Sequence, residues 1–395
     1  MSILLLILGI VLFILLVVTH ELGHFWVARR NGVVAEEFGV FFPPRIYKRQ
    51  MKGWLFSVGL LPLGGFVKLK GEHDSDTAKG SFGAASLWVK TKIMLAGIIV
   101  NIVTALVLLT ILAVIGLPDL IPHQFTVDSD TKTHVSTITA KDGKYFNIDK
   151  VIAGSAAQKA GIKKGDHLLA IGPAGHVQAV NDPDGLGAVT KKLAGQKVSV
   201  ELKRKDHKLT VQATIPTAKQ LAASHQKGYL GIESSASFSN LKLRHSTWSA
   251  PVVAVGFSAQ ATALTFEGLG HALGGLGSLI AGTVTGNHAA REHGQTAASS
   301  QVAGPVGVFA ILQTSSSLGY QFVLFIIAIV ALTLGIMNLL PIPALDGGRL
   351  WLMLISRAFG RPLTASLEEG VNAVGFLLII ALAITITYVD IHRFF

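Results

Sequence analysis

This chain contains four long stretches of apolar residues. Three of them, at 93–117, 319–340 and 370–389, each contain the roughly 20 residues that a helix needs to cross a bilayer. A fourth occupies 1–28. No Lys or Arg precedes Arg29, whereas a cleaved signal peptide carries positive charge ahead of its apolar core. The pattern therefore predicts four transmembrane helices, the first of them permanent.

Polar and apolar residues alternate within the long segment between the second and third predicted helices. The sequence KVSVELKRKDHKLTVQAT at 197–214 alternates on both sides of Lys205 and Asp206, which predicts a β-hairpin. We therefore expect a mainly β domain inserted between two membrane helices.

Composition supports the membrane assignment and narrows the chemistry. Hydrophobic residues make up 50% of the 395 residues, charged residues 14%, and the mean hydropathy is +0.53, which is too apolar for an ordinary soluble domain. Cysteine is absent, so any catalytic metal must be bound by His and carboxylates. The formal net charge of +11 fits a membrane surface. Because no basic helix is interleaved with aromatic residues, we expect no nucleic-acid partner.

The distribution of Lys and Arg predicts the orientation in the membrane. The segment 29–92 holds 11 of the 34 Lys and Arg residues, which places it in the cytoplasm by the positive-inside rule. The 19 in 116–319 belong to a segment long enough to be largely exempt from that rule. We therefore expect the long segment outside the cell and the connection 341–369 inside.

The first predicted helix carries ionisable residues near its cytoplasmic end, in the sequence HELGH. His20 and His24 are four residues apart, which puts both imidazoles on one helical face, with Glu21 beside them. This spacing lets two imidazoles bind one Zn²⁺ while the Glu acts on its water as general base. The alternative is a polar helix end whose side chains reach the membrane interface. Ionisable groups inside a membrane nevertheless favour a functional site.

A catalytic zinc site needs a third protein ligand at the same membrane depth. The third predicted helix ends at Pro341 and Pro343, and Asp346 follows. The predicted topology brings this end to the cytoplasmic side, level with His20 and His24. Asp346 is therefore the candidate third ligand, although an Asp-Gly-Gly sequence in this place can also form a simple turn.

Together, HELGH and NLLPIPALDG resemble the motifs of the site-2 protease family of intramembrane zinc metalloproteases. PLGGFVKLKGE, LAGIIVN and AGPVGV resemble the family's cytoplasmic β-hairpin loop, its second membrane helix and the stretch before its third, so the likeness covers most of the chain. Ile98 stands where the family usually has Pro, and Phe42-Pro43-Pro44 replaces a more usual Gly-Pro. Neither departure touches the metal motifs.

The resemblance implies an intramembrane metalloendopeptidase with Zn²⁺ as its cofactor. It implies that His20, His24 and Asp346 are the zinc ligands. It further implies that Glu21 is the catalytic base and that Asn338 helps to hold the substrate backbone. The implied substrates are single-span membrane proteins, such as anti-sigma factors, or the membrane remnants of signal peptides. The implied location is a bacterial cytoplasmic membrane, with the active site near the cytoplasmic face.

The sequence VIAGSAAQKAGIKKGDHLLAIG at 151–172 also resembles the core of a PDZ domain, with a strand, a short helix from Ser155 and a second strand. The Gram-positive branch of the family carries one copy of this domain. We place this domain at 125–216, outside the membrane, with a peptide-carboxylate loop near 145–148. It would either capture a peptide at a sheet edge or filter substrates by size. The expected fold class is a polytopic α-helical membrane protein with four transmembrane helices, this inserted extracytoplasmic PDZ domain, and a small cytoplasmic β-hairpin region within 29–92.

The stretch 245–318 is long and apolar enough to be mistaken for a further span. An extra crossing would put Asp346 and His20 on opposite faces of the membrane. We therefore expect an amphipathic helix on the outer membrane surface followed by a loop. Glu267 and His271 are expected to face water, His288 and His293 to lie in a solvated loop, and His73, Asp74 and Asp76 to form a charged cytoplasmic loop instead of a metal site.

A substrate helix must unwind locally before cleavage, because its carbonyl groups are occupied by its own hydrogen bonds. The strand-like sequence containing Gly65, Phe66 and Val67 could offer an edge on which the unwound segment pairs as an extra strand. Two other classes of function are weaker alternatives. A non-catalytic scaffold would use only the PDZ domain, and a transporter would distribute polar residues along several helices.

Overall fold

The computed structural model describes residues 2–136, 146–148, 150–180, 183–205, 207–224, 228–233, 241–287, 305–360 and 363–394. Contacts divide the chain into two compact units, Met1–Thr133 with Arg244–Phe395, and His134–Leu243. Several positions discussed above lie outside the described residues: His288 and His293 of the expected loop, Tyr145 of the expected carboxylate loop, and Asp206 of the hairpin.

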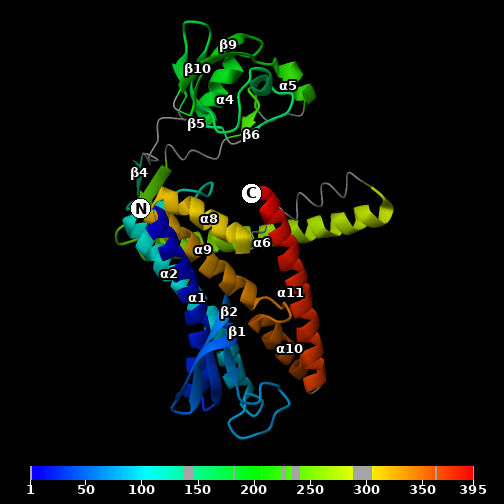
Figure 1. The fold of residues 1–395 in the computed structure, drawn as a ribbon. Coiled ribbons are helices and arrows are strands. Elements are labelled where there is room, and N and C mark those ends of the chain that lie inside the picture. Colours follow the sequence, from blue (N-terminus) through cyan, green and yellow to red (C-terminus); the bar gives the residue numbers. More distant parts are fainter. Residues whose placement is uncertain are drawn as a thin grey trace. The chain divides into compact units, whose positions relative to one another are not determined.

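The first unit consists mainly of helices. In chain order these are α1 (Ser2–Arg30), α2 (Leu87–Ile115), α6 (Ala250–Thr285), α8 (Pro305–Leu318), α9 (Tyr320–Leu339), α10 (Asp346–Ala358) and α11 (Ala365–Phe394). Figure 1 shows α1, α2, α9 and α11 running along one bundle, with α10 near the end where α1 finishes. α2 begins at Leu87, ahead of the predicted start at 93, because the Ser86 side chain accepts a hydrogen bond from the Val89 amide and caps the first turn.

Small residues allow these helices to approach closely. Ala105, Ala328 and Ala331 are fully buried in the helical core. A Cβ atom added at Gly23 of α1 would lie 3.0 Å from the carbonyl oxygen of Ala96 on α2. Since packing drives helix association in lipid, these positions hold α1 and α9 against α2.

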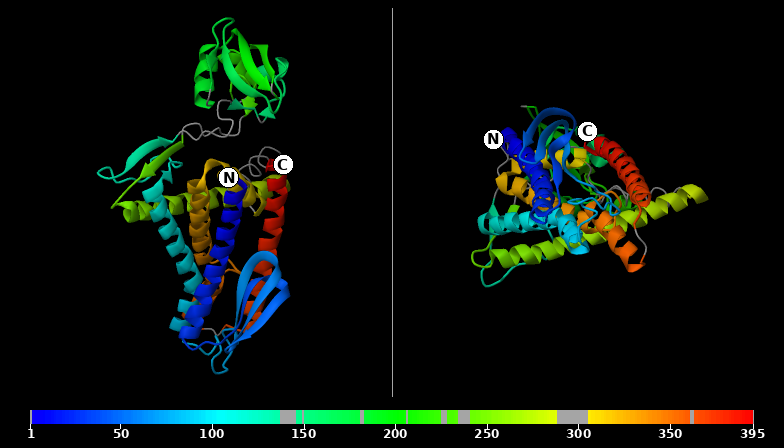
Figure 2. Two further views of the ribbon diagram at one scale, coloured as in Figure 1. Left: turned by 60° about the vertical axis from the view of Figure 1, so that its left-hand side comes forward. Right: turned by 90° about the horizontal axis from the view of Figure 1, so that it is seen from below.

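Five of the described helices contain windows long and apolar enough to cross a membrane: Ile3–Arg30, Leu87–Ile115, Ala250–Gly275, Tyr320–Leu339 and Ala365–Ile384. Four overlap the predicted spans, and the fifth is the first part of α6. Figures 1 and 2 both show α6 running across the end of the bundle at which α1 begins and α2 ends. There Phe257 packs edge-on against Phe325 of α9, with ring centroids 5.7 Å apart. Glu267 and His271 are exposed. The count of four spans remains a prediction.

A small sheet between α1 and α2 in the sequence is formed by β1 (Ala35–Met51) and β2 (Trp54–Leu69). Residues 37–40 of β1 pair with 65–68 on one side and with 55–58 on the other, because both strands bend and pair twice. Residues 47–50 then pair with the far side of 55–58. Within the described part of the chain, 65–68 therefore forms one edge of this sheet.

A buried charge holds the middle of this sheet. Arg45 donates two hydrogen bonds of 2.8 Å to the Glu37 carboxylate, and Ser57 donates a third of 2.6 Å. Burial of Glu37 favours its neutral form, but these hydrogen bonds outweigh it and hold the pKa of Glu37 below its ordinary value. Glu37 is therefore ionised at neutral pH and links Arg45 of β1 to Ser57 of β2.

Buried ion pairs anchor the loop that follows β2. The Lys90 side chain is 0% exposed and pairs with Asp74, which is 6% exposed. On the other side, Arg349 of α10 donates a 2.8 Å hydrogen bond to Glu368 of α11. Glu368 also accepts a 3.1 Å hydrogen bond from the Asp74 amide. This loop therefore joins α2, α10 and α11 at the end of the bundle that carries the sheet.

Asp74→Asn should lower the free energy of unfolding by about 3 kcal/mol, because the change leaves the buried Lys90 ammonium without its counterion. The control is Glu36→Gln, which breaks an exposed pair with Lys68 and should change stability by less than about 1 kcal/mol. Equilibrium unfolding of the full chain in detergent with increasing SDS measures both values. Equal effects of the two substitutions would show that Lys90 does not depend on Asp74.

The second unit is mainly β. In chain order its elements are β5 (Phe146–Asn147), β6 (Lys150–Val151), α3 (Ala156–Lys159), β7 (His167–Gly172), β8 (Gln178–Ala179), α4 (Pro183–Lys192), β9 (Lys197–Arg204), β10 (His207–Thr214), α5 (Ala218–Ser224) and β11 (Ile232–Glu233). The main sheet has the order β10-β9-β7-β5, with β8 paired to β7, and β6 pairs with β11. The Ser155 side chain caps α3, and Leu168, Val198 and Leu202 are fully buried. Assignment of this unit as a PDZ domain remains a prediction.

Three further strands, β3 (Leu117–Pro118), β4 (Lys132–Ser136) and β12 (Leu241–His245), form a separate sheet in the order β3-β12-β4.

Candidate metal centre

Helix α1 presents His20 and His24 on one face. The helix continues through both residues to Arg30, so their four-residue spacing places one imidazole a turn above the other. The side chains are 12% and 9% exposed, and the ring centroids lie 4.9 Å apart. Both rings are therefore withdrawn from solvent inside the bundle.

A tight turn brings Asp346 to these two imidazoles. α9 ends at Leu339, just before the two prolines, and α10 begins at Asp346. Two glycines follow, and a Cβ atom on either would collide with this turn: Gly347 at 2.4 Å from the Leu340 oxygen, Gly348 at 2.1 Å from the Ile342 oxygen. Glycine at both positions therefore lets α10 start directly against the end of α9 and carry Asp346 toward α1.

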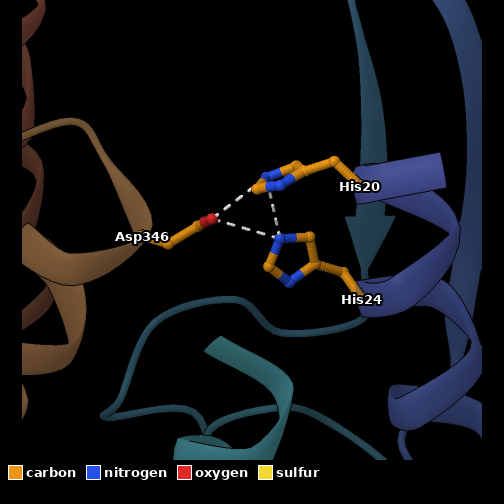
Figure 3. A group of neighbouring side chains, drawn as sticks. All are labelled: His20, His24 and Asp346. Carbon is orange, nitrogen blue, oxygen red and sulfur yellow. Dashed lines mark hydrogen bonds and ion pairs between the residues drawn. The ribbon is translucent and has the colours of Figure 1, made fainter. Parts of the chain in front are cut away.

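The three side chains converge on one point, as Figure 3 shows. The Asp346 Oδ2 atom lies 3.2 Å from His20 Nε2 and 3.1 Å from His24 Nε2, and the two nitrogens are 3.3 Å apart. Two atoms that each lie about 2.0–2.1 Å from a tetrahedral zinc ion are about 3.3–3.4 Å apart. These spacings, and the donor set of two imidazoles and one carboxylate, fit Zn²⁺ with a fourth position left for water or substrate. Among the described residues, this is the only group of three or more His and acidic side chains with ligand atoms close enough to share a metal ion.

The backbone of α2 lies directly against the two imidazoles. The His24 Nδ1 atom lies 2.7 Å from the Ile93 carbonyl oxygen, so His24 donates its Nδ1 proton there and keeps Nε2 free to bind a metal. A Cβ atom at Gly97 would lie 2.3 Å from His24 Nε2 and 2.7 Å from His20 Nδ1. Sequence reasoning missed both contacts. A glycine inside an apolar helix signals a close approach but does not say what approaches.

Glu21 is half-buried and follows His20 on α1. A Cβ atom at Gly65 would lie 3.1 Å from Glu21 Cγ, so the edge segment of β2 passes directly beside the candidate base. Phe66 stacks on Phe42 with ring centroids 6.2 Å apart, and Val67 pairs with Phe38 inside the sheet. The structure thus brings the predicted edge and the predicted base together.

Asn338 lies half-buried in the last turn of α9. A Cβ atom at Gly347 would be 2.5 Å from its carbonyl oxygen. The Asn338 backbone is therefore adjacent to the residue that follows Asp346. His73, Asp74 and Asp76 do not join the metal centre. His73 instead approaches Glu369, with His73 Nε2 3.2 Å from its carboxylate.

Comparison with known proteins extends over nearly the whole chain. The family described as peptidase family M50 matches residues 8–382. The chain is 25% identical to zinc metalloprotease RasP of Shouchella clausii, with 98% of each protein covered. It is 23% identical to protease RseP of Yersinia pestis, with 96% of each covered.

Proposed function

Because this chain belongs to peptidase family M50, the site-2 proteases, and is a zinc metalloendopeptidase, we propose that it cleaves its substrates within the membrane, with His20, His24 and Asp346 as the zinc ligands of its active site. The observation that carries the proposal is the convergence of three ligand atoms on one point beside Glu21. The five long apolar helices are those of a multi-pass membrane protein. Cleavage of a tagged single-span substrate by the purified chain, with zinc content measured on the same sample, tests it.

In this proposal His20, His24 and Asp346 hold the metal, and Glu21 moves the protons. Bound Zn²⁺ supplies a Lewis acid that polarises the scissile carbonyl and makes water acidic enough to react near neutral pH. Glu21 takes a proton from the attacking water and returns it to the leaving amine when the peptide bond breaks. The Ile93 carbonyl keeps the His24 ring in the tautomer that offers Nε2 to the metal.

The substrate backbone would pair with the free edge of β2. In the part of the chain that the structure describes, no strand pairs with the outer side of 65–68, and Gly65 lies against Glu21. An unwound substrate segment that added a strand there would exchange its helical hydrogen bonds for bonds to the strand containing Gly65, Phe66 and Val67. It would also pass beside the metal centre. Asn338, next to the turn that carries Asp346, would hold the substrate backbone from the opposite side.

Val67→Pro should slow cleavage at least about tenfold, because proline removes a backbone donor and disturbs the edge on which the substrate pairs. The matched control is Val67→Ala, which keeps the backbone donor and should cleave nearly as well as the wild type. Zinc content of both variants verifies that the metal centre survives. Unchanged cleavage by a zinc-loaded Val67→Pro protein would show that this edge does not bind substrate.

The orientation follows from the positive charge of 29–92. We place the metal centre near the cytoplasmic face of a bacterial cell membrane, α6 on the outer membrane surface, and the second unit outside. That unit would act as a PDZ domain, either capturing peptides or limiting substrates by size. The substrates would be single-span membrane proteins or signal-peptide remnants in the lipid bilayer.

A further inference from the structure

A groove runs between α1 and α2. Its volume is about 1060 Å³, and its lining includes Leu22, Trp26, Arg30, Trp88, Lys92 and Ile99. None of the residues assigned to catalysis lines it. Its floor is formed where Gly23 meets the Ala96 carbonyl, since α1 and α2 approach closely there and leave space between the larger side chains on either side.

The groove changes character along its length. Toward the middle of the helices its walls are apolar, with Leu22 and Ile99 40% and 54% exposed. At the other end stand two tryptophans, Trp26 and Trp88, which are 71% and 66% exposed. Exposed indoles of this kind are typical of the boundary between hydrocarbon and headgroups. The groove therefore extends from that boundary into the hydrocarbon.

Two cations stand at the tryptophan end. Arg30 ends α1, and Lys92 lies one turn after Trp88 on α2, with its ammonium 5.4 Å from the Trp88 ring centroid. No acidic residue lines the groove. Among the described residues, neither Arg30 nor Lys92 forms an ion pair with a carboxylate. The end of the groove thus combines two uncompensated positive charges with an apolar trough.

We propose that this groove binds one anionic phospholipid, with an acyl chain along Leu22 and Ile99 and the headgroup phosphate between Arg30 and Lys92. Basic pockets between transmembrane helices on the cytoplasmic side suit anionic headgroups. The positive charges of Arg30 and Lys92 disfavour two other occupants, a substrate helix and a second copy of this chain. A substrate helix carries its own positive residues at the cytoplasmic end, and a second copy of this chain would bring a second Arg30 and Lys92.

Native mass spectrometry of the full chain in detergent tests the proposal, with phosphatidylglycerol and phosphatidylcholine of identical acyl chains as probes. The wild type should retain one phosphatidylglycerol in preference to phosphatidylcholine. Arg30→Gln with Lys92→Gln should weaken that retention roughly 10- to 30-fold. The matched control is Arg29→Gln with Lys52→Gln, which removes the same charge near the same membrane face outside the groove. It should retain the lipid like the wild type.

A second variant tests the apolar part without changing charge. Ile99→Trp should fill the apolar part of the groove and reduce retention of both lipids. Equal losses in the two charge variants, no preference in the wild type, or full retention by Ile99→Trp would each overturn the proposal. A dimer that strengthens when Arg30 and Lys92 are neutralised would identify a second copy as the occupant. Because the readout is lipid retention, it does not depend on proteolysis.

Discussion

Glu21→Gln is expected to abolish measurable cleavage while leaving zinc bound. A glutamine at this position keeps the shape of the side chain but cannot accept the proton of the attacking water. General-base catalysis of this kind contributes about 10²–10⁴-fold to the rate. His20, His24 and Asp346 are untouched, so the metal content should equal that of the wild type. Cleavage of a tagged single-span substrate in detergent and elemental analysis of the same samples measure the two quantities.

The control for this prediction is Glu267→Gln, which neutralises an exposed glutamate on α6 and should cleave at the wild-type rate. Two outcomes would contradict the assignment. Full activity of Glu21→Gln would remove Glu21 from the mechanism. Absence of zinc from well-folded wild-type protein would favour the scaffold, in which the His and Asp side chains are only structural.

The approach of Asp346 to His20 and His24 could be predicted from the sequence because it follows from helical spacing and from the expected membrane topology. Residues four positions apart lie on one face of an α-helix, so His20 and His24 share a face. The topology requires the end of the third membrane helix to return to the same side, which brings Asp346 to them. The structure joins all three side chains, with Nε2 and Oδ2 atoms 3.1–3.3 Å apart. Their role as ligands remains a prediction until metal is measured.

The pairing of β1 with β2 could not be predicted in the same way. The sequence indicates a strand-like stretch around Gly65 but contains no signal that residues 37–40 pair on two sides. That arrangement depends on bends in both strands and on the buried Glu37 carboxylate, which accepts hydrogen bonds from Arg45 on the same strand and from Ser57 on β2. The edge and the base could therefore be proposed separately, but their contact through Gly65 and Glu21 required the structure.

The α6 helix shows the limit of hydropathy. Ala250–Gly275 is long and apolar enough to be a span, although it is the least apolar of the five candidate helices. Hydropathy reports how apolar a helix is, and says nothing of its direction relative to the others. Figure 1 shows α6 crossing the end of the bundle, and this direction agrees with the topology that keeps Asp346 and His20 on one side.

Gly97→Ala is expected to release zinc from an otherwise folded protein. The added Cβ would lie 2.3 Å from His24 Nε2, 2.5 Å from His20 Cε1 and 2.7 Å from His20 Nδ1. All three atoms belong to side chains that can rotate away, so the helices need not separate. The imidazoles would move, however, and their ligand atoms would no longer meet at Asp346. Alanine is also the better helix former, so the change should not weaken α2 itself.

We expect the affinity for zinc to fall roughly 100-fold, at the upper end of what disturbed support of metal ligands produces. Competition with a chelator of known affinity measures it on the purified chain. The matched control is Gly274→Ala on α6, where an added Cβ meets nothing within 4 Å and zinc binding should be unchanged. Wild-type affinity in Gly97→Ala would mean that the imidazoles bind no metal at this point, because a methyl group so close to His24 Nε2 leaves that nitrogen no room to coordinate.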